Sequence, residues 1–245
     1  MTFIKNEIKP TQLITNLVPL DFLNRGEVLA DVEKILAHGE MQQKLESLLP
    51  RSIVQTEFNL NGLLNLHFSS AAESIAAAQI LESIAEARWA AGAHEMHCKI
   101  DLEMINSFFA TAEDVNYEFM PTKLERNCVQ GGVVRLLIGF PQGAEEQDRA
   151  HTHPGGRIVV AIKQDGEFQT PVKGRARKLS HGSAIIMPAR AVHNFSSVGQ
   201  RGASVPEGLT VNDILSGTVP GTVFLSFHIG FVNIDSPDAL MYVSP

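Results

Sequence analysis

The stretch AHTHPGGRIVVAIKQDG, residues 150–166, constrains the fold of this chain more than any other feature. Two histidines separated by one residue precede a Pro-Gly-Gly bend, and the apolar run that follows ends at an Asp-Gly turn. On an extended strand, residues i and i+2 point to the same face, so His151 and His153 project together and can reach one metal ion. A metal needs at least one more ligand, which a neighbouring strand can supply. The candidate is His193 in HGSAIIMPARAVHNF.

The first half of the chain carries helical periodicity. Residues 26–49 place apolar side chains close to a 3.6-residue stripe, and the Ala-rich residues 69–93 favour a second helix. Between them, residues 53–68 read as two short strands around an Asn-Gly pair, which predicts a β-hairpin. We expect a third helical piece over residues 101–112.

The second half changes character after about residue 115. Runs such as GGVVRLLIGF and GTVFLSFHIGFV are short, rich in β-branched and aromatic residues, and separated by Gly, Pro and Asp. This pattern is typical of an antiparallel barrel or sandwich, and no internal repeat suggests a second copy. The sequence therefore predicts an α+β chain. A mostly helical N-terminal extension with a short β-hairpin covers residues 1–115, and a β-domain covers residues 116–245.

Charge and composition exclude several function classes. The chain has 245 residues, a formal net charge of −7 and no cluster of Lys and Arg, so nucleic acid is not an expected partner. No stretch reaches the roughly 20 apolar residues that cross a bilayer, and the N-terminus lacks the apolar core of a signal peptide. The two cysteines, Cys98 and Cys128, form no CxxC motif. This favours free thiols in a cytoplasmic setting, with a single disulfide as the alternative.

Two segments of the β-rich half resemble the two sequence motifs of the cupin superfamily. Residues 151–166 are similar to the first motif, which contains two histidines separated by one residue. A later segment is similar to the second motif, with matching spacing of Gly182, Pro188 and His193. The resemblance covers roughly residues 116–240. It implies an antiparallel cupin β-barrel, a double-stranded β-helix of the jelly-roll type.

The match departs from the cupin pattern at five positions. Two of them are the closing glycine of the first motif, which comes late at Gly166, and the final asparagine of the second, where this chain has Ser197. The first motif begins with a glycine where this chain has Glu145, and the second has a glycine where this chain has Arg190. The remaining departure is Arg157, which stands where the family has the glutamate of its metal site. The resemblance therefore implies a three-histidine ligand set, similar to that of cysteine, diketone and gentisate-type dioxygenases, which bind Fe(II).

Arg157 changes the electrostatics expected of such a site. Three neutral imidazoles leave a divalent ion with its full charge, and a guanidinium nearby favours an anionic ligand such as a carboxylate, enolate or thiolate. Arg135 and His228 are further candidates for binding the substrate. Two alternatives stay open. After the Pro-Gly-Gly bend the strand phase can reset, leaving Arg157 on the surface beside a carboxylate such as Glu167, or an inward Arg157 can mark a weakened or lost metal site.

The leading hypothesis is a mononuclear non-haem Fe(II) dioxygenase that acts on a small anionic substrate. His151, His153 and His193 would hold the ion, for which Zn, Mn and Ni are alternatives to Fe(II). No catalytic residue is assigned. The alternative function is a non-catalytic small-molecule sensor or binding protein, in which the N-terminal helices transmit occupancy of the site. We also expect a homodimer.

Overall fold

The computed structural model describes residues 25–66, 69–105, 122–129, 132–139, 151–153, 155–163, 166–170, 175–197, 222–231 and 241–242. Within these residues the chain is α+β. The helices are α2 (Arg25–His38), α3 (Glu40–Leu48), α4 (Leu60–Leu64) and α5 (Ala71–Ala90). The strands are β1 (Glu57–Phe58), β2 (Glu95–Cys98), β3 (Thr122–Val129), β4 (Gly132–Gly139), β5 (His151–Thr152), β6 (Arg157–Lys163), β7 (Gly166–Thr170), β8 (Arg175–Leu179), β9 (Ser183–Met187), β10 (Asn194–Ser197), β11 (Thr222–Phe231) and β12 (Met241–Tyr242).

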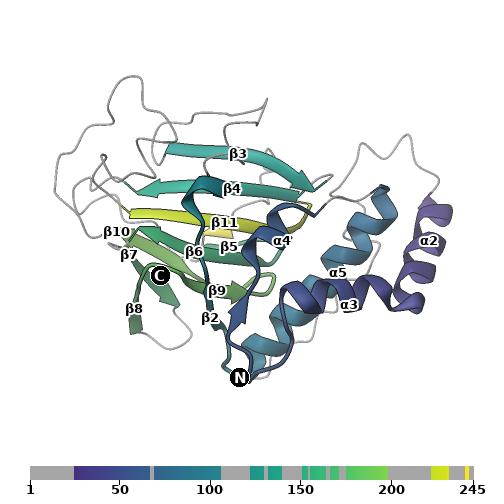
Figure 1. The fold of residues 1–245 in the computed structure, drawn as a ribbon, viewed down its shortest axis with the longest axis horizontal. Helices are drawn as coiled ribbons and strands as arrows, with labels where there is room; N and C mark the ends of the chain where they lie inside the picture. Colours follow the sequence, from purple (N-terminus) through teal and green to yellow (C-terminus); the bar gives the residue numbers. More distant parts are fainter. Residues whose placement is uncertain are drawn as a thin grey trace.

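The described strands form three sheets. The largest has seven strands in the order β1-β2-β9-β6-β11-β4-β3, the second has the order β10-β7-β8, and the third pairs β12 with β5. Every pair is antiparallel except β1 with β2, which is parallel. Figure 1 shows the strands of the large sheet running side by side, with α2, α3 and α5 gathered beyond one end of them.

Two strands from the predicted helical extension belong to the large sheet. β2 pairs with β9, with Met96 opposite Ala184, and β1 pairs with β2. Cys98, at the end of β2, is a free and buried thiol. The predicted domain boundary after residue 115 lies outside the described residues and stays a prediction. Of the third predicted helix, residues 102–105 form a helical turn and the rest lie outside the described part.

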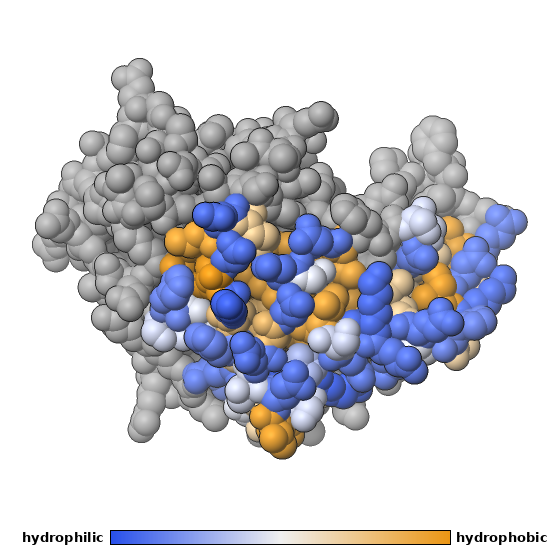
Figure 2. Space-filling model, viewed as in Figure 1, coloured by the Kyte–Doolittle hydropathy of each residue, from blue (hydrophilic) through white to orange (hydrophobic). Residues whose placement is uncertain are grey.

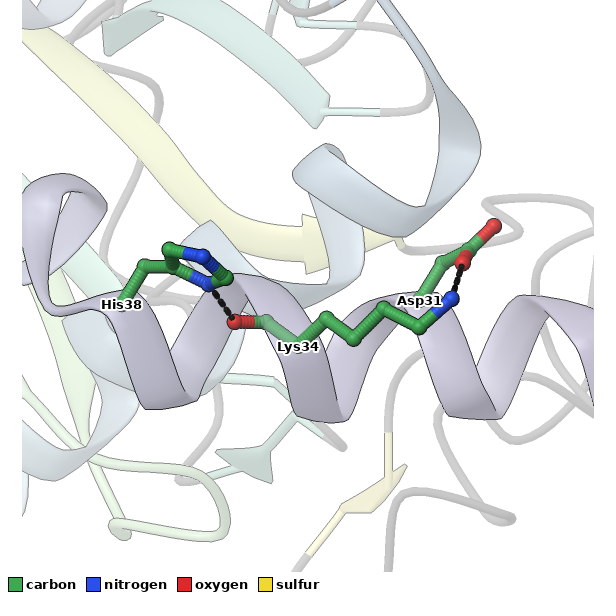
Figure 3. A network of polar contacts seen from close by, with 3 residues as sticks. All are labelled: Asp31, Lys34 and His38. Atoms are coloured by element: carbon green, nitrogen blue, oxygen red, sulfur yellow. Dashed lines mark hydrogen bonds and ion pairs between the residues drawn. The ribbon is translucent and has the colours of Figure 1, made fainter.

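The structure divides the first predicted helix into α2 and α3 at Gly39. Gly39 has a φ of 72°, a left-handed conformation that glycine adopts without a steric penalty. Along α2, the Lys34 ammonium lies 3.0 Å from Asp31 Oδ1, and His38 Nδ1 lies 2.6 Å from the Lys34 carbonyl oxygen (Figure 3). These contacts are exposed, so they add little to stability, and the two helices depend on their packing.

The predicted hairpin over residues 53–68 is wrong. Among the described residues of this stretch, β1 is the one strand, and the Asn-Gly pair lies inside α4. Asn59 caps this helix, because its side-chain oxygen accepts a hydrogen bond from the Gly62 N–H at 2.9 Å. The helical spacing of buried leucines therefore outweighs the turn preference of the Asn-Gly pair. These leucines are Leu60, Leu63 and Leu64.

The main core lies between α5 and the seven-stranded sheet. Ile84 of α5 shares a buried cluster with Ile158 of β6, Ile186 of β9 and Phe227 of β11. Val159 of β6 belongs to a second cluster on the opposite face, so β6 is buried on both sides. Figure 2 shows mostly hydrophilic residues over the outer surface of α2 and α3. In the part of the chain that the structure describes, no helix is both long and apolar enough to cross a membrane.

Candidate metal centre

The three histidines of the two motif-like segments meet in the structure. One ring nitrogen from each of His151, His153 and His193 lies within 4.8 Å of the others. The ring centroids are 4.8 Å apart for His151 and His153, 4.4 Å for His151 and His193, and 5.2 Å for His153 and His193. All three side chains are buried. Among the described residues, this is the one group of three or more His, Cys, Asp or Glu side chains close enough to hold an ion.

Backbone hydrogen bonds hold the two histidine-bearing segments together. The His151 N–H donates to the His193 carbonyl oxygen at 2.9 Å, and the His193 N–H donates to that of His151 at 3.0 Å. The Arg190 N–H donates to the His153 carbonyl oxygen at 2.8 Å. The relative position of the imidazoles is therefore set by main-chain pairing between segments that are far apart in the sequence.

Two turns in the second segment depend on left-handed backbone conformations. Gly182 has a φ of 80°, and a Cβ atom there would lie 2.7 Å from His97 Cε1 and 2.8 Å from the Cys98 carbonyl oxygen. Arg190 has a φ of 61° at the position where the cupin motif has glycine. The chain therefore keeps the turn that a glycine would form, at a cost of about 1–2 kcal/mol for a residue with a Cβ atom.

His193 is held as a neutral imidazole with its proton on Nδ1. Its Nδ1 lies 2.8 Å from the Ala191 carbonyl oxygen, which can only accept, so Nδ1 carries the proton. Burial lowers the pKa of His193 well below its ordinary value, and the charges of Arg157 and His151 lower it further. A neutral ring with one nitrogen fixed by a carbonyl is the state that metal-binding histidines require.

Arg157 lies beside the histidines and not on the surface. Its side chain is only 5% exposed, and its NH2 group lies 3.3 Å from His153 Nδ1. A guanidinium only donates, so Nδ1 accepts and the neutral His153 ring carries its proton on Nε2. This tautomer cannot bind an ion through Nε2. The three imidazoles fit a divalent ion of the Fe, Zn, Mn or Ni type, provided that Arg157 releases His153.

The other two predicted substrate-binding residues are placed only by strand register. β11 places His228 opposite Arg157, and β4 places Arg135 opposite Ser226. Their side chains lie outside the part of the structure that is described, so their roles stay predictions. A cavity of about 440 Å³ lies elsewhere, lined mainly by residues 55–61, and it contains none of the three histidines.

Sequence reasoning missed Glu82 of α5. One oxygen of its carboxylate accepts a hydrogen bond from the Gly156 N–H at 3.0 Å, and the other accepts from the Ala189 N–H. Burial raises the pKa of Glu82 to about 7. The sequence did hold a signal, because Glu82 lies between Leu81 and Ala85 on the buried face of an Ala-rich helix. A carboxylate in such a place needs partners.

No family model matches the sequence, and no curated protein matches it. Solved structures that it resembles include a cupin-like protein from Thermotoga maritima, with 19% identity and a TM-score of 0.30 over 46% of this chain and 65% of that one. Another is the polyketide cyclase RemF from Streptomyces resistomycificus, with 17% identity and a TM-score of 0.35 over 54% of this chain and 82% of that one. A third is a salicylate 1,2-dioxygenase from Pseudaminobacter salicylatoxidans, with 8% identity and a TM-score of 0.30 over 44% of this chain and 26% of that one. These overlaps are too low to carry an argument about function, which rests on the residues of the site.

Proposed function

We propose that this chain is a single-barrel cupin that binds one divalent metal ion through His151, His153 and His193. The observation that carries the proposal is the convergence of three buried imidazoles from the two segments that resemble the cupin motifs. The antiparallel pairing of β6 with β9 and β11 supports a barrel of the jelly-roll type. The left-handed turns at Gly182 and Arg190 support it further, since the motif has glycine at both positions.

We infer that the ion is Fe(II) and that the activity is oxygenation of a small anionic substrate. When bound, Fe(II) would supply Lewis acidity and one-electron chemistry toward O2. As metal ligands the three imidazoles would be neutral, and within the described residues no carboxylate joins them. Arg157 adds a permanent positive charge in a buried place. A site of this charge favours a carboxylate, enolate or thiolate as its partner.

Arg157 has two tasks in this proposal. Its guanidinium binds the anionic group of the substrate, with Arg135 and His228 as predicted additions. For this it must leave His153 Nδ1, to which it donates at 3.3 Å in the structure. Once the guanidinium no longer donates to it, Nδ1 can carry the His153 proton, and Nε2 can then serve as the ligand atom.

The second candidate is a non-catalytic sensor or binding protein. The contact between Arg157 and His153 favours it, because this contact keeps His153 in a tautomer that cannot bind an ion through Nε2. The packing of α5 against β9 and β11 would give a direct route from the site to the helices. We also propose a homodimer, which sedimentation velocity tests separately.

Oxygen uptake separates the two candidates. Protein reconstituted anaerobically with Fe(II) is mixed with small carboxylates, 1,3-diketones and thiols, and O2 consumption is followed. Substrate-dependent uptake that is lost in His153→Ala supports the dioxygenase. His38→Ala, which removes an exposed histidine on α2, is the matched control and should keep full activity. Tight binding of an anion without any uptake would favour the sensor instead.

A further inference from the structure

Glu82 connects the helical region to both histidine-bearing segments. It is a half-buried residue of α5, and its two carboxylate oxygens accept from two different turns. Gly156 N–H, the donor to Oε2 at 3.0 Å, lies between His153 and Arg157 in the sequence. Ala189 N–H, the donor to Oε1, lies four residues before His193. One side chain therefore bridges the turn that follows His153 and the turn that precedes His193.

The turn at Gly156 is held from two sides. Its N–H donates to Glu82, and its carbonyl oxygen accepts from the Ile229 N–H of β11 at 2.8 Å. A Cβ atom at Gly156 would overlap with Glu82 Oε2 and would lie 2.8 Å from the Met187 carbonyl oxygen. The second glycine of the Pro-Gly-Gly bend is thus needed for the close approach of the carboxylate.

The turn at Ala189 needs the same support for a different reason. The next residue, Arg190, has a φ of 61°, a strained conformation that persists only if neighbouring contacts fix it. The Arg190 N–H bonds the His153 carbonyl oxygen at 2.8 Å, while the preceding N–H bonds Glu82. Two consecutive amide groups of this strained turn are consequently fixed by groups of the metal centre and of α5.

We propose that Glu82 is a positioning residue, which fixes the separation of the two histidine-bearing turns and so links α5 to the metal centre. Both oxygens of a carboxyl group can accept from an amide N–H, whereas a glutamine side chain has one acceptor oxygen and an NH2 group that only donates. The bridging of the two turns stands without a metal, whereas the effect on metal affinity rests on the proposed function.

The test compares Glu82→Gln with Glu86→Gln, an exposed glutamate one turn further along the same helix. Circular dichroism first confirms that both variants are folded. Hydrogen exchange of the metal-free proteins is then followed by mass spectrometry. Glu82→Gln should exchange faster at residues 155–157 and 188–193 while the core of α5 keeps its protection, and Glu86→Gln should match the wild type.

A Co²⁺ titration followed by visible absorption gives the second measurement. The dissociation constant of Glu82→Gln should rise by roughly 10- to 100-fold, as for other residues that orient metal ligands, with an altered absorption spectrum. Glu86→Gln should keep both. A general loss of stability would speed exchange throughout the protein, not only at the two turns. It would also leave the Co²⁺ spectrum of the folded molecules unchanged. The two measurements together therefore distinguish a positioning role from an effect on overall stability.

The outcomes separate this inference from the proposed function. Wild-type exchange at both turns in Glu82→Gln would overturn the bridge, and wild-type Co²⁺ affinity and spectrum would overturn the positioning role. If the wild-type protein binds no Co²⁺, the proposed metal-binding function is wrong. The exchange measurement then still tests whether Glu82 bridges the two turns. Should Glu82→Gln not fold, Gly156→Ala displaces the same carboxylate from the other side and must give the same local pattern.

Discussion

Removing the guanidinium of Arg157 should strengthen metal binding. In the metal-free protein its NH2 group donates to His153 Nδ1 at 3.3 Å, and both side chains are buried. A hydrogen bond to a charged group contributes about 1.5–3 kcal/mol, and this long contact belongs at the lower end, at about 1.5 kcal/mol. An ion that takes His153 must break this bond, and it also meets the repulsion of the positive charge. Arg157→Met should therefore bind Zn²⁺ or Co²⁺ at least about tenfold more tightly.

Isothermal titration in a buffer without coordinating anions measures this change. Arg51→Met, which removes an exposed arginine paired with Glu46 in the helical region, is the control and should keep wild-type affinity. Once loaded with metal, Arg157→Met should bind acetate or formate more weakly than the wild type, because the guanidinium is the proposed anion partner. Metal affinity of Arg157→Met equal to or weaker than the wild type would refute the competition between Arg157 and the ion.

Three further changes test the turns and the buried carboxylate. Gly182→Ala should lower stability by about 2 kcal/mol or more, since the new Cβ would lie 2.7 Å from His97 Cε1 at a φ of 80°; an unchanged thermal midpoint would contradict this. Arg190→Gly should leave stability nearly unchanged, because relief of about 1–2 kcal/mol of strain offsets the larger entropy of the unfolded chain; a loss of more than about 1 kcal/mol in chemical denaturation would speak against the strain. Burial raises the pKa of Glu82 from 4.5 to about 7, so its proton stabilises the folded protein fully below pH 4.5 and this contribution is lost as the pH rises through 7. The stability of the wild type relative to Glu82→Gln should therefore fall by up to about 3 kcal/mol over this range, and a difference independent of pH would show that burial does not control this group.

The histidine cluster could be predicted from the sequence because each of its two segments carries a recognisable local pattern. His151 and His153 are brought together by the alternation of a strand, and the structure bears out their meeting with His193. The glycine spacing of the second segment likewise encodes a turn, which Gly182 forms with a positive φ. Even the departure at Arg190 is understandable locally, since the turn persists with a residue that is strained in it.

The parts that could not be predicted depend on contacts between distant residues. The Asn-Gly pair favours a hairpin locally, but the leucines around it are buried in α4, and packing decides the outcome. β1 and β2 join the large sheet because β2 pairs with β9, which lies far away in the sequence. Whether Arg157 points toward the histidines or toward the surface could not be predicted, because the strand phase can reset at the Pro-Gly-Gly bend. The helix pattern indicates that Glu82 needs partners, but not that these lie in turns more than 70 residues away.

The metal content of the protein, measured by elemental analysis alongside His193→Ala, is the most direct test of the site. His193 has Nδ1 bonded to the Ala191 carbonyl oxygen and a neutral ring, so its loss removes a preformed ligand. We expect about one Fe, Mn, Ni or Zn per wild-type chain, lost in His193→Ala and kept in the control His38→Ala. No metal in the wild type, even after reconstitution with Fe(II), would contradict the three-histidine metal centre and leave Arg157 as the sign of a lost site.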